Sequence, residues 1–111
     1  MAKYLLLALN GPTQGAGDEE ALNRWYDEVH MPAFRQIPQV KSARRFKVLR
    51  GKIPGRELWP YVTAYEIETD DLPALSARFQ KELSSFHPAL DRENSGNIMA
   101  IQISGDEALF D

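Results

Sequence analysis

Apolar and β-branched residues divide the chain into four predicted strands. Residues 3–9 are almost continuously apolar and end at Asn10-Gly11-Pro12, which favours a strand buried on both faces. Residues 40–49 and 61–68 carry β-branched and aromatic residues on either side of a loop rich in Gly and Pro. Residues 98–103 alternate again before Gly105, so they form the fourth predicted strand.

Residues at helical spacing predict a first helix between the first two strands. It begins near Asp18, and its apolar stripe comprises Leu22, Trp25, Tyr26 and Val29. Pro32 disfavours the α conformation of the residue before it, so we expect this helix to end or kink at His30.

A second helix is predicted after the third strand. Residue 70 or 71, both aspartates, serves as its cap. Its apolar face comprises Leu72, Leu75, Phe79, Leu83 and Phe86.

The order strand, helix, strand, strand, helix, strand predicts an α+β fold of the ferredoxin-like βαββαβ type. A four-stranded antiparallel sheet then carries both helices on one face, in a single domain over residues 1–111. The residues of either strand parity are too apolar to face water, although the sequence does not fix which parity lies under the helices. We therefore expect a homodimer whose two sheets pack face to face.

Composition narrows the class of protein. With 43% hydrophobic and 26% charged residues and a formal net charge of −3, the chain has the composition of a globular protein and lacks the basic excess typical of a nucleic-acid binder. The longest apolar run, residues 4–9, is too short to span a bilayer and lacks a signal-peptide cleavage site, so we expect a cytoplasmic protein without a membrane partner. The absence of cysteine excludes a disulfide framework and a thiol nucleophile.

Residues 22–48, LNRWYDEVHMPAFRQIPQVKSARRFKV, resemble the EthD-like group of the dimeric α+β barrel superfamily. In that group a helix with a W-Y-x-x-x-H-x-P run is followed by an Ile-Pro pair and a strand with an Ala-Arg-Arg-Phe motif. The matching residues are Trp25, Tyr26, His30, Pro32, Ile37, Pro38, Val40, Ala43, Arg44, Arg45 and Phe46. The resemblance implies the fold, but the superfamily includes monooxygenases, isomerases, cyclases and peroxidases, so the reaction has to be argued from the site.

His30 has two interpretations. As a structural residue it bonds a free carbonyl at the end of the helix, where the helix dipole raises its pKa. As a functional residue it lies beside a cavity and transfers protons near neutral pH. The resemblance places a histidine at this point of the motif, which supports the functional interpretation.

Aromatic residues predict the walls of a pocket for a small apolar or aromatic ligand. Tyr26, Tyr61 and Tyr65 are the expected lining, and Trp59, at the end of the loop, is expected as a lid or a dimer contact. His87, before Pro88, has the same two interpretations as His30.

Arg44 is the second candidate catalytic residue. Alternation over residues 40–49 places Val40, Ser42, Arg44, Phe46 and Val48 on one face of the strand. On an inward-facing position the Arg44 guanidinium holds a carboxylate or enolate oxygen of the substrate. The alternative is that Arg44 or Arg45 pairs with Glu66 on the next strand.

No metal or cofactor site is predicted, because the two histidines lie far apart and no phosphate loop or serine elbow occurs. The first functional hypothesis is therefore a small homodimeric, cofactor-independent enzyme that acts on an aromatic or polyketide-like molecule by proton transfer. The alternative is a non-catalytic ligand-binding or accessory protein of an EthD-like degradation pathway. A third possibility is a dimer interface that leaves no cavity.

Overall fold

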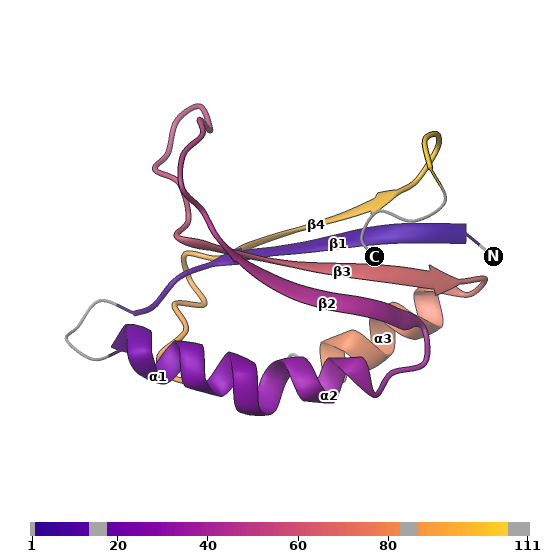
Figure 1. Cartoon of the computed structure of the whole chain (residues 1–111), viewed down its shortest axis with the longest axis horizontal. Coiled ribbons are helices and arrows are strands. Elements are labelled where there is room, and N and C mark those ends of the chain that lie inside the picture. The colour runs from indigo at the N-terminus through magenta and orange to yellow at the C-terminus, as the bar shows by residue number, and fades with distance from the viewer. Residues whose placement is uncertain (1, 14–17, 83–86, 107–111) are drawn as a thin grey trace.

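A computed structural model describes residues 2–13, 18–82 and 87–106, and its strands form one antiparallel sheet in the order β2-β3-β1-β4. The strands are β1 (Ala2–Asn10), β2 (Val40–Lys47), β3 (Tyr61–Thr69) and β4 (Gly96–Ile101). The helical segments are α1 (Asp18–Trp25), η1 (Tyr26–His30), α2 (Met31–Arg35) and α3 (Leu72–Glu82). All of them lie on the same face of the sheet (Figure 1), so the predicted ferredoxin-like α+β fold is confirmed.

Strand register fixes which residues face the helices. Tyr4, Leu6 and Ala8 of β1 pack against the core, and Leu6 pairs with Tyr65 of β3 on one side and Met99 of β4 on the other. Because side chains alternate along a strand, Leu5, Leu7 and Leu9 lie on the opposite face, where no described helix covers them. This face is called the open face below.

A β-bulge in β2 changes the parity that alternation predicts. Val40 pairs with Ile67, whereas Ser42 pairs with Glu66, so one extra residue is inserted between them. Val40 therefore joins Ala43 in the core beneath the helices. The expectation that Val40 shares a face with Ser42 and Arg44 was wrong for this reason.

Pro32 led us to expect an end or a kink of the first helix at His30, and the end does not occur, because the helix continues to Arg35 (Figure 1). The segment η1 is a π turn in which the Met31 N–H donates to the Tyr26 carbonyl, and Met31 itself has helical dihedral angles of −65° and −42°. A proline lacks an N–H and its ring crowds the preceding turn of an α-helix. The wider π turn lies directly before Pro32 and accommodates it.

The π turn also keeps residues four apart on one face. Leu22, Tyr26, His30 and Phe34 are all buried. In an α-helix of 3.6 residues per turn, each step of four residues overshoots a full turn, so this row would drift around the helix. The wider π turn compensates for this rotation, so the row stays on one face. Val29, which was expected in the apolar stripe, is turned toward solvent and is 55% exposed.

Asp71 caps α3, as the sequence indicated. Its Oδ1 accepts a hydrogen bond from the Ala74 N–H at 3.1 Å. Leu75 and Phe79 are buried in the core, whereas the predicted positions 83 and 86 lie outside the described residues. Among the helices that the structure describes, none is long and apolar enough to cross a membrane.

Arg45 ties β2 to the first helix. Its Nη1 donates to Asn23 Oδ1 of α1, and its guanidinium carbon lies 4.4 Å from the Tyr26 ring centroid and 4.1 Å from that of Tyr61. The guanidinium thus contacts two aromatic rings, a favourable arrangement for a planar cation. Its buried Nε and Nη2 have no hydrogen-bond partner among the described residues.

We expect Arg45→Lys to lower the free energy of unfolding by about 1–2 kcal/mol, because an ammonium group replaces neither the planar stacking nor the fixed fork of donors. Urea denaturation measures the change. Arg50→Lys, at an exposed loop position, is the matched control and should leave the midpoint unchanged. Equal midpoints for both variants would contradict a stabilising role for the stacked guanidinium.

Candidate functional site

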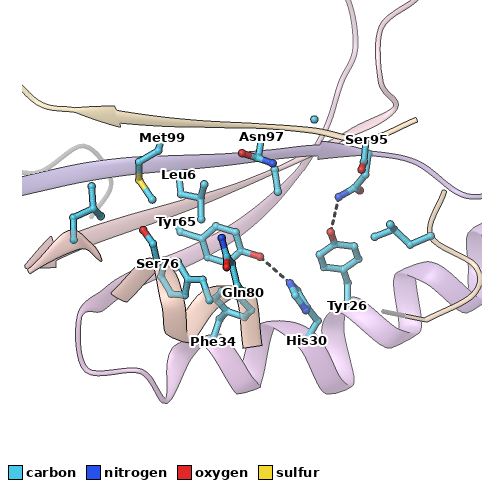
Figure 2. A pocket seen from close by; sticks show the side chains of 16 residues that line it. Leu6, Tyr26, His30, Phe34, Tyr65, Ser76, Gln80, Ser95, Asn97 and Met99 are labelled. Atoms are coloured by element: carbon cyan, nitrogen blue, oxygen red, sulfur yellow. Dashed lines mark hydrogen bonds between the residues drawn. The ribbon is translucent and has the colours of Figure 1, made fainter. Parts of the chain in front are cut away.

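A cavity of about 450 Å³ lies between the sheet and the helices. Strands β1 and β3 supply its floor, η1 and α2 one wall, and α3 and β4 the other sides (Figure 2). Most of its interior is apolar, with Leu6, Phe34, Phe79 and Met99 among the lining residues. A concave, mostly apolar space with a few polar groups is the usual form of a small-molecule site.

His30 is part of the cavity wall and is only 6% exposed. A hydrogen bond of 3.1 Å joins its Nε2 to the Tyr65 hydroxyl (Figure 2). Aromatic rings surround the imidazole: Trp25 stacks on it at a centroid distance of 4.7 Å, and Phe34 lies at 4.7 Å. Tyr26 meets it edge-on at 5.0 Å.

Burial among these rings lowers the pKa of His30 to about 4 from its usual 6.5. Burial also raises the pKa of the Tyr65 hydroxyl above its ordinary value, with nearby Tyr26 adding to the effect and Arg45 opposing it. Both groups are therefore neutral at neutral pH. Of the two interpretations of His30, the helix-end role with a raised pKa is wrong, because the helix continues past His30 and burial lowers its pKa.

A second polar pair lies next to the first. The Asn10 Nδ2 donates to the Tyr26 hydroxyl at 2.6 Å, and both side chains are buried in the lining of the cavity. Burial raises the pKa of Tyr26, while the Asn10 and Thr63 side chains and the Arg45 charge oppose the rise. Sequence analysis missed Asn10 as a site residue; the available signal was its shared parity with Leu6 and Ala8 at the end of an apolar strand.

The structure therefore brings three predicted site residues, His30, Tyr26 and Tyr65, into one cavity. Tyr61 is on the same face of the sheet but outside the lining, where its hydroxyl donates to Glu19 and its ring contacts Arg45. The predicted lining role of Tyr61 thus has no counterpart in the geometry of this cavity.

His87 is also outside the lining. Its Nδ1 accepts a hydrogen bond of 3.0 Å from the Ala89 N–H, which closes a local turn. Its ring lies 6.3 Å from that of Trp25, which in turn stacks on His30. His87 is thus separated from the cavity histidine by an indole ring.

Trp59 packs against the lining of the cavity at Gly96. Its Nε1 donates to the Asn94 carbonyl at 2.7 Å, and the Arg56 guanidinium lies 3.4 Å from its ring centroid. A Cβ atom on Gly96, whose backbone is part of the cavity lining, would lie 3.1 Å from the Trp59 ring. Trp59 therefore packs against the beginning of β4, and its role as a lid or dimer contact stays a prediction.

Arg44 does not lie with His30. It pairs with Ala64 of β3 at a position that alternates with Ala43 and Arg45, so it lies on the open face together with Glu66. The arginine on the helix side is Arg45. Within one chain, the two residues predicted as catalytic are thus on opposite faces of the sheet.

Among the described residues, no three His, Asp or Glu side chains are grouped so that they could hold a metal ion. The polar side chains that the described residues bring to the cavity are neutral amides, hydroxyls and the His30 imidazole. Such a set binds and orients an organic ligand and, through the imidazole, exchanges a proton with it.

Comparison with solved structures identifies a protein of the same fold. It is the crystal structure, at 1.40 Å resolution, of an ethyl tert-butyl ether D (EthD) family protein from Bacillus halodurans C-125. The match covers 93% of this chain and 100% of the other, with a TM-score of 0.58 and 16% sequence identity. No protein-family model and no curated protein sequence matches the chain. The chain therefore has the fold of an EthD family protein, as its Trp25-to-Phe46 motif indicated.

Proposed function

We propose that the protein is a small, cofactor-independent enzyme that binds an aromatic or polyketide-like molecule in the cavity and transfers a proton through His30. One observation carries the proposal: a neutral, buried histidine, bonded to a tyrosine hydroxyl, forms the wall of an apolar cavity. A neutral imidazole has a lone pair with which to accept a proton.

The His30–Tyr65 pair suits proton abstraction next to a carbonyl or phenolic oxygen. In this reaction the His30 imidazole takes a proton from the ligand, and negative charge develops on the ligand oxygen. The Tyr65 hydroxyl, whose raised pKa keeps its proton in place, turns from Nε2 to donate to that oxygen. The imidazolium and the ligand anion then stabilise one another in the apolar surroundings.

The low pKa of His30 makes it a weak base in the free protein. A ligand on which negative charge develops raises that pKa, because an opposite charge nearby favours the imidazolium. The proposed base is thus activated only when the cavity is occupied.

The same low pKa favours a second function, in which the protein binds the ligand without turnover and serves as an accessory protein. In that case His30 stays neutral and only orients the ligand. Product formed by the purified protein alone would rule out this alternative.

We further propose that the open face forms a homodimer interface. Leu5, Leu7 and Leu9 form its centre, and the flanking Ile98 and Phe46 are 52% and 41% exposed. An apolar sheet face of this kind is stabilised by a second copy with the same surface. The cavity lies on the other side of the sheet, so this packing leaves it open to ligand.

In an NMR titration of the free protein, the His30 ring should titrate near pH 4, well below the usual 6.5. The unfolded state then takes up this proton first as the pH falls, so stability declines between about pH 6.5 and 4. The decline from this group is about 3 kcal/mol. His30→Gln should remove that component, and His87→Gln assigns the two histidine signals. A His30 signal that titrates at its usual pH would contradict the buried neutral state.

With a substrate identified from a screen of phenols, quinols and lactones, His30→Gln should lower kcat by about 100- to 10,000-fold, because the proton acceptor is lost. Tyr65→Phe should lower kcat about tenfold through the missing hydrogen bond to the developing anion. His87→Gln serves as the control. Unchanged turnover in a folded His30→Gln variant would sink the proposed mechanism.

Ile98→Lys should convert a dimer to a monomer in sedimentation equilibrium at micromolar concentration, because a lysine is costly to bury in an apolar interface. Val29→Lys is the matched control, since Val29 is exposed to a similar extent, 55%, but lies on the helix side. A monomeric wild-type protein would disprove the interface.

A further inference from the structure

The described residues of the cavity lining carry no formal charge. None of these 16 residues is Asp, Glu, Lys or Arg. Its ionisable members are His30, whose pKa is lowered to about 4, and Tyr26 and Tyr65, whose pKa values are raised. A carboxylate or phosphate on the ligand would therefore enter an apolar space without a cation in the lining to pair with it.

Asn10, one of the lining residues, holds a buried acceptor beside the same space. Its side chain is only 4% exposed, and its Nδ2 is already engaged with Tyr26. Its Oδ1 has no hydrogen-bond partner among the described residues. Buried polar atoms of native proteins are nearly always bonded, and an exception in a cavity needs a partner from outside the chain.

Neutral polar groups also border the cavity from α3 and β4. Ser76 and Gln80 reach toward it from α3, Asn97 from β4 and Ser95 from the position just before β4 (Figure 2). Hydroxyl and amide groups of this kind form hydrogen bonds with ligand groups that are also neutral. Removing them from water costs less free energy than removing charged side chains. The described residues at the border of the cavity are thus uncharged, as are those in its interior.

We propose that the ligand of this cavity is an uncharged aromatic molecule with a phenolic or enolic hydroxyl, and that this hydroxyl donates to Asn10 Oδ1 after the Asn10 amide turns toward the ligand. Asn10 is then the residue that selects hydroxylated ligands over their O-alkylated or carboxylated relatives. The inference rests on the proposed function only in requiring that the cavity binds a small molecule, and it holds for both the catalytic and the non-catalytic version.

The position of Asn10 also relates ligand binding to the histidine. Asn10 bonds the Tyr26 hydroxyl, and the Tyr26 ring meets the His30 ring at 5.0 Å. A ligand hydroxyl at Asn10 therefore holds the attached ring on the side of the cavity where the His30–Tyr65 pair lies. Asn10 acts in this way as a binding and positioning residue rather than as a proton acceptor.

The test uses three probes of one ring size with the full-length protein at pH 7.5: 2-naphthol, 2-methoxynaphthalene and 2-naphthoate. Binding is measured by isothermal titration calorimetry. We expect 2-naphthol to bind about five- to tenfold more tightly than the methyl ether, which lacks the donor. We expect 2-naphthoate to bind at least about 100-fold more weakly than 2-naphthol.

Asn10→Leu, which replaces the amide with an alkyl group of similar size, should reduce 2-naphthol affinity by about five- to tenfold and leave 2-methoxynaphthalene within about twofold. The variant also distinguishes a hydrogen-bond effect from a steric effect of the methyl group. Loss of the Asn10 acceptor weakens the binding of 2-naphthol but not that of the methyl ether. Asn94→Leu is the matched control, since it makes the same change at an exposed residue outside the cavity lining. It should preserve the preference for 2-naphthol.

Equal affinities for 2-naphthol and its ether in the wild-type protein would overturn the role of Asn10, even if Asn10→Leu fails to fold. Tight binding of 2-naphthoate that strengthens as the pH falls would overturn the uncharged class, because it would indicate a carboxylate paired with protonated His30. Binding of none of the three probes would instead contradict the proposed ligand-binding function itself.

Discussion

The π turn before Pro32 determines which side of the first helix meets the sheet. It is closed by the hydrogen bond from the Met31 N–H to the Tyr26 carbonyl. Because of this turn, Tyr26, His30 and Phe34 stay in one row above the sheet although they are spaced four residues apart. A regular α-helix would turn part of this row away, and the cavity would lose either its histidine or the aromatic rings beside it.

Burial then defines the chemistry of the site. Aromatic rings on three sides exclude water from His30 and lower its pKa, so that the His30–Tyr65 pair is neutral. The same environment makes an unmet acceptor such as Asn10 Oδ1 costly until a ligand donates to it. The charged guanidinium of Arg45 contacts the Tyr26 ring but is not part of the described cavity lining. The cavity therefore combines an uncharged lining with hydrogen-bonding groups that a hydroxylated ring satisfies.

Periodicity predicted the order of strands and helices because the strands and the α3 helix follow regular spacing. It failed where a single residue changed the register. Pro32 predicted an end or a kink at His30, but the helix continues to Arg35 through a π turn that a local rule on proline does not foresee. The bulge in β2 moved Val40 to the helix side. Tyr26 and Tyr65, which were predicted from aromatic content, lie in the same cavity as His30. Asn10 was missed because its unpaired oxygen is a property of tertiary burial, which the sequence around a Gly-Pro turn does not reveal.

A crystal structure of the protein soaked with 2-naphthol tests most directly whether the cavity beside His30 is a ligand site. The account predicts the naphthol ring inside the cavity next to Phe34, with its oxygen about 3 Å from Asn10 Oδ1. Electron density for the naphthol only on the open face of the sheet, with the cavity between the helices and the sheet closed by its own side chains, would contradict it.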